Sequence, residues 1–234
     1  MFIKSAAFYD AIYSFKDYEA EARWIDELIT ARLGPGERRS ILDVACGTGA
    51  HIAHLKTKYQ IEGIDVERAL LTIAKQRNPG IELNYGDMGT FDLGRQFDVV
   101  MCLFSSIGYV RTVPRLQRTL LNFAKHVAPG GMVIVEPWLT PDKFTDRYIS
   151  CDLVDQPELK IARMAFSRHL GNQSATEFNY LIATPKGIQH IEELHELGLF
   201  EDRQYQEAFT QAGLTVERLD EGLMGRGVYV GSRA

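Results

Sequence analysis

Short apolar runs alternate with stretches of helical periodicity along the first 136 residues. Short runs of this kind are typical of strands that are buried on both faces of a parallel sheet. Between the runs, apolar side chains recur every three or four residues, as expected for helices with one buried face. The alternation predicts an α/β fold with a doubly wound parallel sheet. The predicted strands are 41–44, 61–65, 82–85, 96–102 and 132–136, and the predicted helices are 18–33, 50–58, 67–77 and 114–127.

The period changes to two between residues 137 and 200. Alternation over 159–166, 176–182 and 188–195 predicts antiparallel strands with one wet face. A last helix over 201–212 and a hairpin of strands 214–219 and 228–230 follow. We therefore expect a core with an N-terminal lid helix (1–136), an inserted antiparallel sheet for substrate recognition or dimerisation (137–200), and a C-terminal helix and hairpin that complete the core (201–234).

A glycine turn, DVACGTG at 43–49, follows the first buried strand. Glycine tolerates positive φ and lets the backbone approach a ligand closely. Ligands of open α/β sheets bind beyond the carboxyl ends of the strands. We therefore expect a nucleotide-like cofactor at Gly47 to Gly49. The dinucleotide fingerprint needs a third glycine, and Ile52 stands in its place, which argues against a nicotinamide-dependent dehydrogenase.

Two acids and a methionine follow the next two predicted strands. Asp65 ends the strand 61–65, and Asp87 and Met88 come just after the strand 82–85. A carboxylate can accept both ribose hydroxyls, a polar group can meet the adenine amine, and an apolar side chain can sandwich the ring. These residues suit an adenosine, although ordinary strand-end acids are the alternative interpretation.

The glycine turn and the strand-end acids, in this order, resemble the class I S-adenosylmethionine (SAM) methyltransferases, which have a Rossmann-like doubly wound sheet. The resemblance covers residues 40–136. It implies that Asp65 holds the ribose and that Asp87 and Met88 hold the adenine. It also implies that the turn of Ala45, Gly47 and Gly49 holds the methionine end of SAM.

Composition excludes several other classes. The chain has 45% hydrophobic and 24% charged residues and a net charge of −5, which is typical of an ordinary globular domain and argues against a general nucleic-acid binder. Three separated cysteines without a C-x-x-C pair predict neither a disulfide framework nor a zinc site, and the six histidines show no metal-ligand spacing. We find no signal peptide and no apolar run of 18 residues, so we expect no membrane partner and a cytoplasmic protein.

A closer resemblance covers nearly the whole chain. The sequences FSSIGY (104–109), VEPW (135–138), H-x-x-x-x-F (195–200) and GRG (225–227), together with YD (9–10) and KDY (16–18), resemble the N,N-dimethyltransferases of amino-sugar biosynthesis. Those enzymes act on TDP-linked 3-amino-3,6-dideoxy sugars on the way to desosamine and mycaminose, in antibiotic biosynthesis. The resemblance implies a small nucleotide sugar as the substrate.

The closer resemblance also implies residue roles. Tyr9, Tyr18 and Leu103 would contact SAM, although packing is an alternative for the tyrosines. Arg226 would meet a pyrophosphate, because its guanidinium matches phosphate oxygens; a surface charge in a glycine turn is the alternative. The predicted substrate-side residues are Trp138, Arg163, His195 and Arg226, and for His195 packing is equally compatible with the pattern.

Methyl transfer is an in-line displacement, so the protein mainly aligns the nucleophile with the methyl carbon. A base is needed only when the nucleophile arrives protonated. We assign Tyr109 a catalytic positioning role with weak base character; some family members carry histidine there.

Other functions remain open at this point. They are methylation of another small amine or a hydroxyl-bearing metabolite, and a non-catalytic SAM sensor. A homodimer through the inserted sheet is a further hypothesis, motivated by its alternating faces.

Overall fold

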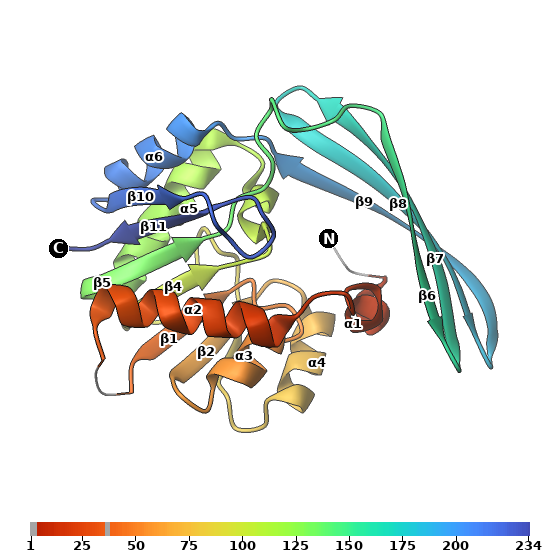
Figure 1. Ribbon diagram of the computed structural model, residues 1–234, viewed down its shortest axis with the longest axis horizontal. Helices are drawn as coiled ribbons and strands as arrows, with labels where there is room; N and C mark the ends of the chain where they lie inside the picture. Colours follow the sequence, from red (N-terminus) through yellow and green to blue (C-terminus); the bar gives the residue numbers. More distant parts are fainter. Residues whose placement is uncertain (1–3, 36–37) are drawn as a thin grey trace.

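A seven-stranded sheet forms the centre of the protein in the computed structural model, which describes residues 4–35 and 38–234 (Figure 1). The strand order is β10-β11-β5-β4-β1-β2-β3. β1 to β5 are parallel, and β11 runs antiparallel between β5 and β10. The predicted doubly wound α/β class is therefore confirmed. The strands are β1 (Ser40–Val44), β2 (Gln60–Asp65), β3 (Leu83–Tyr85), β4 (Phe97–Cys102), β5 (Val127–Val135), β10 (Thr215–Leu219) and β11 (Val228–Ser232).

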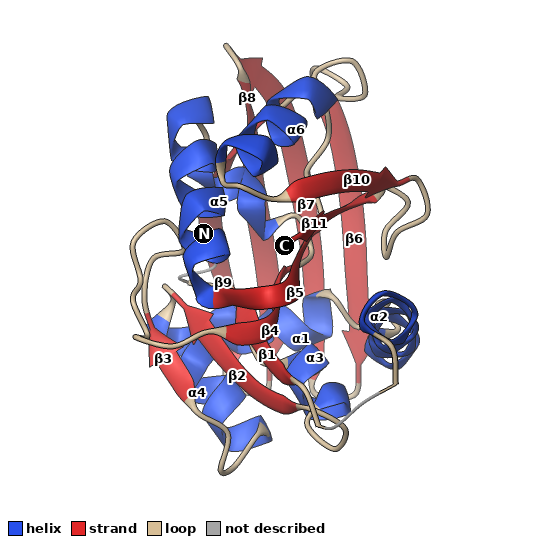
Figure 2. Ribbon diagram, turned by 90° about the vertical axis from the view of Figure 1, so that its left-hand side faces the viewer, coloured by secondary structure: helices blue, strands red, loops and turns tan. Residues whose placement is uncertain are grey.

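Helices cover both faces of this sheet (Figure 2). α5 and α6 pack on one face, and α2, α3 and α4 pack on the other. Local sequence sets their ends: the Asp17 side chain accepts a hydrogen bond from Ala20 N at 2.9 Å at the start of α2, and Gly34 ends it at φ 75°. None of the described helices is both long and apolar enough to cross a membrane. The helices are α2 (Tyr18–Leu33), α3 (Ala50–Leu55), α4 (Arg68–Arg77), α5 (Val113–His126) and α6 (Asp202–Gln211).

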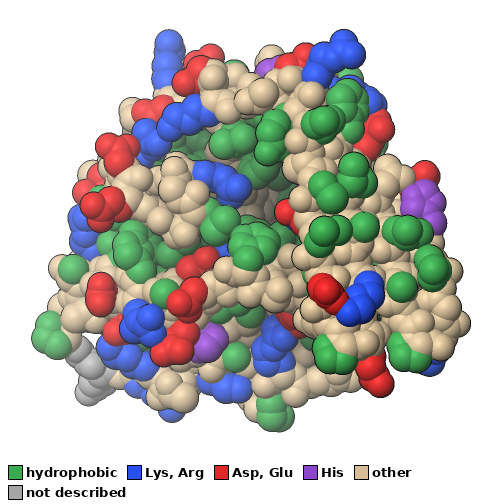
Figure 3. Space-filling view, turned by 45° about the vertical axis from the view of Figure 1, so that its right-hand side comes forward, with side chains coloured by type: hydrophobic (Ala, Val, Ile, Leu, Met, Phe, Trp, Pro, Cys, Tyr) green, Lys and Arg blue, Asp and Glu red, His purple; other side chains and the backbone are tan. Residues whose placement is uncertain are grey.

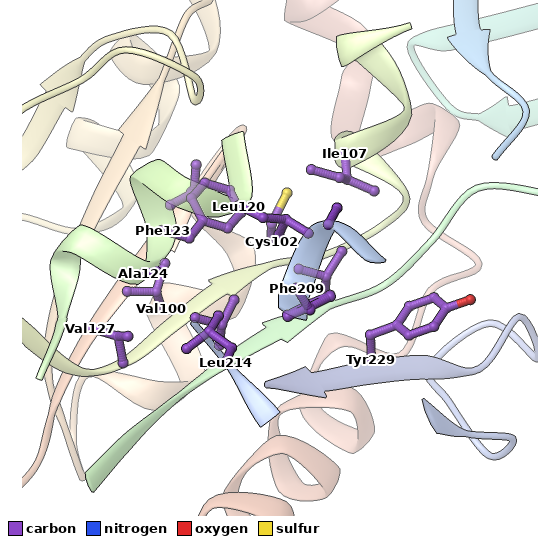
Figure 4. Packing of buried hydrophobic residues seen from close by; sticks show 14 of the residues in the cluster. Val100, Cys102, Ile107, Leu120, Phe123, Ala124, Val127, Phe209, Leu214 and Tyr229 are labelled. Carbon is purple, nitrogen blue, oxygen red and sulfur yellow. The ribbon is translucent and has the colours of Figure 1, made fainter. Parts of the chain in front are cut away.

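Two apolar clusters fill the space between the sheet and its helices. In the first, Leu120 and Phe123 of α5 lie over Val100 and Cys102 of β4 (Figure 4). In the second, side chains of α2, α3 and α4 pack on the opposite faces of the same strands. Strands that are buried on both faces explain why their sequences are continuously apolar.

β5 begins earlier than the sequence pattern predicts. It starts at Val127, and its register with β4 shifts between the pairs Phe97↔Val127 and Val99↔Met132. The Pro-Gly-Gly stretch at 129–131 therefore forms an irregularity within the strand rather than a turn before it. Arg233 N donates to Gly131 O and Gly130 N donates to Arg233 O, so this irregular stretch is paired with the C-terminal end of the chain.

A second, four-stranded antiparallel sheet follows β5 and lies beside the core (Figure 1). Three of its strands were predicted, but all three are longer than expected. The fourth, β6, was missed, because its exposed side carries apolar residues such as Ile149 and Leu153 while its cavity side carries Ser150 and Asp152. A strand with one buried face usually has its apolar residues on the buried side and its polar residues on the exposed side, and β6 has the reverse. The strands are β6 (Tyr148–Gln156), β7 (Leu159–Leu170), β8 (Gln173–Thr184) and β9 (Gly187–Gly198).

The outer face of this second sheet is exposed but not uniformly polar, unlike the wet face that the alternation predicts. Apolar side chains gather there among charged ones (Figure 3). Ile149 is 72% exposed and Leu153 is 76% exposed. Other large apolar residues exposed on this face include Met164, Leu181, Ile188 and Leu194.

The N-terminal segment, residues 4–17, packs between the two sheets. It contains η1 (Ala6–Phe8) and α1 (Tyr9–Ile12). Its apolar side chains form a third cluster, which joins Leu70 of α4 to Ile161, Tyr180, Ile182 and Ile191 of the second sheet. The segment therefore connects the two halves of the molecule.

Truncation of a core leucine should destabilise the fold much more than truncation of its neighbour. Leu120 is fully buried and Leu121 is 51% exposed on the same helix. We expect Leu120→Ala to lower the free energy of unfolding by about 2–5 kcal/mol, and Leu121→Ala to change it by less than about 0.5 kcal/mol. Urea unfolding followed by fluorescence measures both, and equal midpoints for the two variants would contradict the packing described above.

Candidate active site

The glycine turn has the positive-φ backbone that its glycines permit. Ala45, Gly47 and Gly49 all have positive φ, at 60°, 56° and 69°. A Cβ at Gly47 would meet nothing within 4 Å, so this glycine is required by its backbone conformation. A Cβ at Gly49 would lie 2.6 Å from Asn78 Nδ2, and Gly49 lines neither cavity described below. Its structural role is the close approach of α3 to α4.

Asp65 ties two loops together at the end of β2. Its Oδ2 accepts a hydrogen bond from Gly47 N at 2.8 Å, and its Oδ1 accepts one from Glu67 N at 2.7 Å. Burial raises the pKa of Asp65 above its ordinary value, while these backbone hydrogen bonds act in the opposite direction. The carboxylate is therefore fixed in orientation at the edge of the sheet, with lone pairs left for a ligand.

Asp87 and Met88 lie next to Asp65 along the same edge. Asp87 Oδ1 accepts from Gly89 N at 2.8 Å, and its Oδ2 lies 3.3 Å from Arg115 Nη2. The Met88 side chain packs against the first apolar cluster, and its carbonyl accepts from Asn122. Both residues face the same cavity as Asp65.

A cavity of about 890 Å³ separates the strand ends from the inner face of the second sheet. Sequence-predicted residues from both halves line it: Tyr9, Ala45, Gly47, Asp65, Asp87, Met88, Tyr109, Trp138, Arg163, His195 and Arg226. A small neighbouring cavity of about 30 Å³ brings Tyr18 and Leu103 next to Tyr9 and the glycine turn. The structure thus brings together all the predicted site residues except Gly49.

Asp10 of the N-terminal segment binds to the glycine turn and to α4, a contact that the sequence did not predict. Thr48 Oγ1 donates to Asp10 Oδ1 at 2.8 Å, and Arg77 pairs with Asp10 Oδ2. Arg77 also donates to the Thr48 carbonyl at 2.9 Å.

Tyr13 is a further cavity residue that the sequence analysis missed. Its i, i+4 spacing from Tyr9 was the available signal, because such a pair lies on one face of a helix, and the two ring centroids lie 4.8 Å apart.

The loop after β4 presents Tyr109 to the cavity. Phe104 and Ser105 have positive φ, at 51° and 58°, a strain that is concentrated at functional sites. Glu136 Oε2 stabilises the loop by accepting from Phe104 N at 2.6 Å. The short helix η2 (Ser106–Val110) then places the Tyr109 hydroxyl 2.6 Å from His195 Nδ1 of β9.

Behind His195 lies Glu193, which the sequence analysis missed. His195 Nε2 is 3.5 Å from Glu193 Oε2. Glu193 Oε2 also accepts from Ser5 Oγ at 2.7 Å, and its Oε1 accepts from the backbone N–H groups of Lys4 and Ser5 at 2.7 and 3.1 Å. The alternation places Glu193 and His195 on the same inward face, which was the available signal.

The far end of the cavity is cationic and aromatic. The Arg226 guanidinium lies 4.8 Å from the centre of the Trp138 ring and donates to Ser105 Oγ at 2.9 Å. Trp138 Nε1 donates to Ser174 Oγ at 2.9 Å. Burial lowers the pKa of Arg226, but a guanidinium remains charged in proteins. The arrangement can hold an anionic group beside a flat ring.

Arg163 also lines the cavity, but the N–H groups of its guanidinium already donate hydrogen bonds to other residues of the protein. Its Nε and Nη2 donate to Asp152 Oδ2 at 3.0 and 2.8 Å, and its Nη1 donates to Tyr13 Oη at 3.2 Å. Because Tyr13 belongs to the N-terminal segment, Arg163 binds that segment to the second sheet. A role in substrate binding remains a proposal.

The fold and the strand-end site together define a methyltransferase of class I. Residues 41–131 match the methyltransferase domain family. The chain is 41% identical, over 98% of both chains, to dTDP-3-amino-3,4,6-trideoxy-alpha-D-glucopyranose N,N-dimethyltransferase from Streptomyces venezuelae. It is also 41% identical to dTDP-3-amino-3,6-dideoxy-alpha-D-glucopyranose N,N-dimethyltransferase from Streptomyces fradiae, over 97% of this chain and 89% of that protein.

The crystal structure of Streptomyces venezuelae DesVI superimposes with a TM-score of 0.93 and 41% identity over 99% of each chain. The protein therefore belongs to the methyltransferase family that includes these dTDP-amino-sugar N,N-dimethyltransferases. The resemblance found in the sequence is confirmed, and membership of this family excludes the dehydrogenase alternative.

Removing the charge of Glu193 should cost stability in a pH-dependent way. Its hydrogen bonds outweigh burial and lower the pKa of Glu193 from 4.5 to about 2. Its ionised form therefore stabilises the fold above pH 4.5, and this contribution is lost as the pH falls toward about 2. We expect Glu193→Gln to be less stable than the wild type at pH 7, with a deficit that shrinks between pH 4.5 and pH 2.5.

Urea midpoints across this pH range measure the effect. The matched control is Glu192→Gln, because Glu192 is the adjacent residue and its side chain is 71% exposed. A deficit for Glu193→Gln that stays constant from pH 7 to pH 2.5 would contradict a lowered pKa for Glu193.

Proposed function

We propose that this protein transfers methyl groups from SAM to the amine of a TDP-linked 3-amino-3,6-dideoxy sugar. The observation that carries the proposal is the pairing of two features in one cavity of about 890 Å³: an adenosine-type edge at Asp65 and Asp87, and an anion-binding end at Arg226 and Trp138. Relatives that are 41% identical act on amino sugars of this class by their names. A place in antibiotic biosynthesis is part of the proposal.

The residues at the strand ends fit SAM. Gly47 leaves open space where a side chain would stand, and the Asp65 carboxylate is held in place to receive ribose hydroxyls. Asp43 is fully buried beside the small cavity, and its Oδ2 has no hydrogen-bond partner among the described residues. An orphaned buried acceptor of this kind calls for a donor, which a bound amino-acid end supplies. Bound there, SAM supplies an electrophilic methyl group on a cationic sulfur.

The remaining residues position the two reactants. Met88 and Asp87 would hold the adenine, and Tyr9, Tyr18 and Leu103 would enclose the methionine end. The N-terminal segment would exclude water from the reacting atoms, because Asp10 and Glu193 bind it to both halves of the cavity. Alignment of nucleophile and methyl carbon then supplies the main catalytic effect.

Arg226 favours a nucleotide sugar over a simpler amine. Its guanidinium lines the cavity, is half-buried, and takes part in none of the salt bridges found among the described residues. By contrast, Arg111 and Arg115 at the same cavity pair with Glu196 and Asp87. A buried cation without an anion is costly, and a pyrophosphate removes that cost. A small amine without a phosphate would leave Arg226 unused.

We further propose a cytoplasmic homodimer. The free cysteines Cys46, Cys102 and Cys151 suit a reducing compartment. The outer face of the second sheet exposes Ile149, Leu153, Met164 and Leu181 together, and monomeric proteins rarely leave such a patch uncovered. A second copy of the chain would cover it.

The function is tested by S-adenosylhomocysteine release and product mass on a panel of acceptors. The panel contains TDP-3-amino-3,6-dideoxyglucose, glycine, sarcosine, putrescine and a catechol. We expect turnover on the TDP sugar, with a gain of one or two methyl masses. Arg226→Gln should raise the sugar KM by roughly tenfold or more, because a charge-assisted contact is worth about 1.5–3 kcal/mol.

The affinity for SAM, measured by calorimetry, should be unchanged in Arg226→Gln. Asp65→Ala is the complementary variant: it should weaken SAM binding while the protein stays folded. Turnover on glycine or putrescine but not on the TDP sugar would overturn the nucleotide-sugar assignment.

The dimer is tested by sedimentation of the wild type and of Leu153→Asp/Met164→Asp. We expect the wild type to have the mass of two chains and the double variant the mass of one, because two charges on the covered face would be buried without partners. Leu121→Asp, an exposed apolar site on α5, is the control and should remain dimeric. A wild type with the mass of one chain at micromolar concentration would rule the dimer out.

A further inference from the structure

A line of three side chains runs from the cavity into the second sheet. Tyr109 Oη lies 2.6 Å from His195 Nδ1, and His195 Nε2 lies 3.5 Å from Glu193 Oε2. Tyr109 and His195 both line the cavity, whereas Glu193 does not, and His195 is only 2% exposed. The three come from η2 and β9, and Tyr109 and His195 are 86 residues apart in the chain.

The charge of Glu193 favours one direction for this line. A carboxylate only accepts, so the neutral His195 tautomer that carries its proton on Nε2, 3.5 Å from Glu193 Oε2, is favoured over the one that carries it on Nδ1. His195 Nδ1 is then the acceptor, and the Tyr109 hydroxyl donates to it. The oxygen of Tyr109 consequently turns its lone pairs toward the cavity, where it can accept a proton but not donate one. In serine hydrolases a hydroxyl likewise donates to a histidine nitrogen while the other ring N–H of that histidine donates to a carboxylate.

We propose that Tyr109, His195 and Glu193 form a proton relay that removes the proton from the substrate amine. Tyr109 is the catalytic residue that contacts the amine, His195 is the acceptor that the proton reaches, and Glu193 is a positioning residue that orients the imidazole. This inference rests on the proposed function, because it assigns the relay to an amine acceptor.

The substrate arrives as an ammonium. One of its protons passes to Tyr109 Oη while the Tyr109 proton passes to His195 Nδ1, and the imidazolium returns that proton to solvent, which leaves a free amine. The amine nitrogen attacks the methyl carbon, so that an N–C bond forms and the C–S bond breaks with its electron pair going to sulfur. The product nitrogen carries a positive charge and a proton. That proton takes the same route to solvent, and the free amine can accept a second methyl group.

The surroundings keep each group in the form that the relay needs. Burial raises the pKa of Tyr109 well above its ordinary value, so the phenol stays protonated and acts as a carrier. Burial also lowers the pKa of His195, and this outweighs the nearby Glu193 carboxylate, so the imidazole is neutral near pH 7. The cationic Arg163 of β7 acts in the same direction as burial. The Phe178 ring of β8 packs edge-on against the imidazole, with ring centroids 5.0 Å apart.

The N-terminal segment completes the relay. Ser5 and the backbone N–H of Lys4 hold the Glu193 carboxylate in place. The group that orients His195 is therefore held by the same segment that covers the cofactor end through Asp10. The relay is assembled only when that segment is packed over the cavity.

His195→Asn separates proton transfer from hydrogen bonding. An asparagine amide can still accept from Tyr109 but cannot take up a proton. We expect kcat to fall roughly 10²-fold near pH 7, with the sugar KM and the SAM affinity changed less than about threefold. The early product should shift from the dimethyl to the monomethyl amine, because the product ammonium is no longer deprotonated in the cavity.

Three further variants complete the comparison. Tyr109→Phe should show the same loss of kcat with its SAM affinity retained in calorimetry. The loss in both variants should narrow at about pH 9.5, where the amine arrives already deprotonated. Glu193→Gln should give a smaller loss of kcat, since it only misorients the imidazole. His169→Asn is the control, because it makes the same substitution in the same sheet outside the cavity lining, and its rate should be unchanged.

A wild-type kcat and product ratio in a folded, SAM-binding His195→Asn protein would overturn the relay. Nitrogen-15 NMR of labelled histidine gives a readout that needs no substrate. The His195 signals, assigned by their loss in His195→Asn, should be those of a neutral ring protonated at Nε2 at pH 7, and an imidazolium would also overturn the proposal. Failure of the wild type on the TDP sugar would instead refute the proposed function and leave the NMR result standing.

Discussion

The packing of the N-terminal segment between the two sheets is the interaction on which the active site depends. Its apolar side chains fill the cluster between α4 and the second sheet. Two of its polar side chains bind it to the two halves: Asp10 accepts a hydrogen bond from Thr48 of the glycine turn, and Ser5 donates one to Glu193 of β9. Apolar burial supplies a large but undirected stabilisation. The buried hydrogen bonds fix the register, because leaving either carboxylate unpaired would be costly.

Three buried acids stand where the parallel strands of the core end. Asp43, Asp65 and Glu136 each stand at or near the carboxyl end of a parallel strand, and burial raises the pKa of all three. In a structural core such groups would only lower stability. Their cost is offset where backbone N–H groups meet them, as the amides of Gly47 and Glu67 do at Asp65. The placement of costly groups at one edge is therefore the physical mark of a binding site.

Prediction from the sequence succeeded wherever local pattern decides structure. Continuous apolar runs located the parallel strands to within a few residues, with β5 the exception because a Pro-Gly-Gly irregularity was taken for a turn. Strand-end position predicted that Asp65 and Asp87 lie together, and both line the same cavity. Prediction from the sequence failed for β6, whose apolar residues face outward. It also failed for Glu193 and Asp10, whose hydrogen-bond partners lie 188 and 38 residues away in the chain. No local pattern carries such information.

The sequence by itself determined the fold class, the glycine turn, the strand-end acids and the family, because these follow from periodicity, from backbone conformation and from motifs of adjacent residues. Only the tertiary structure decided that Gly49 serves helix packing, that Arg163 is engaged by Asp152 and Tyr13, and that His195 lies within hydrogen-bond distance of Tyr109. The physical reason is the range of the forces involved. Propensity and alternation act between near neighbours in the chain, whereas the partner of a buried polar group is fixed by which strands and helices the whole fold brings together.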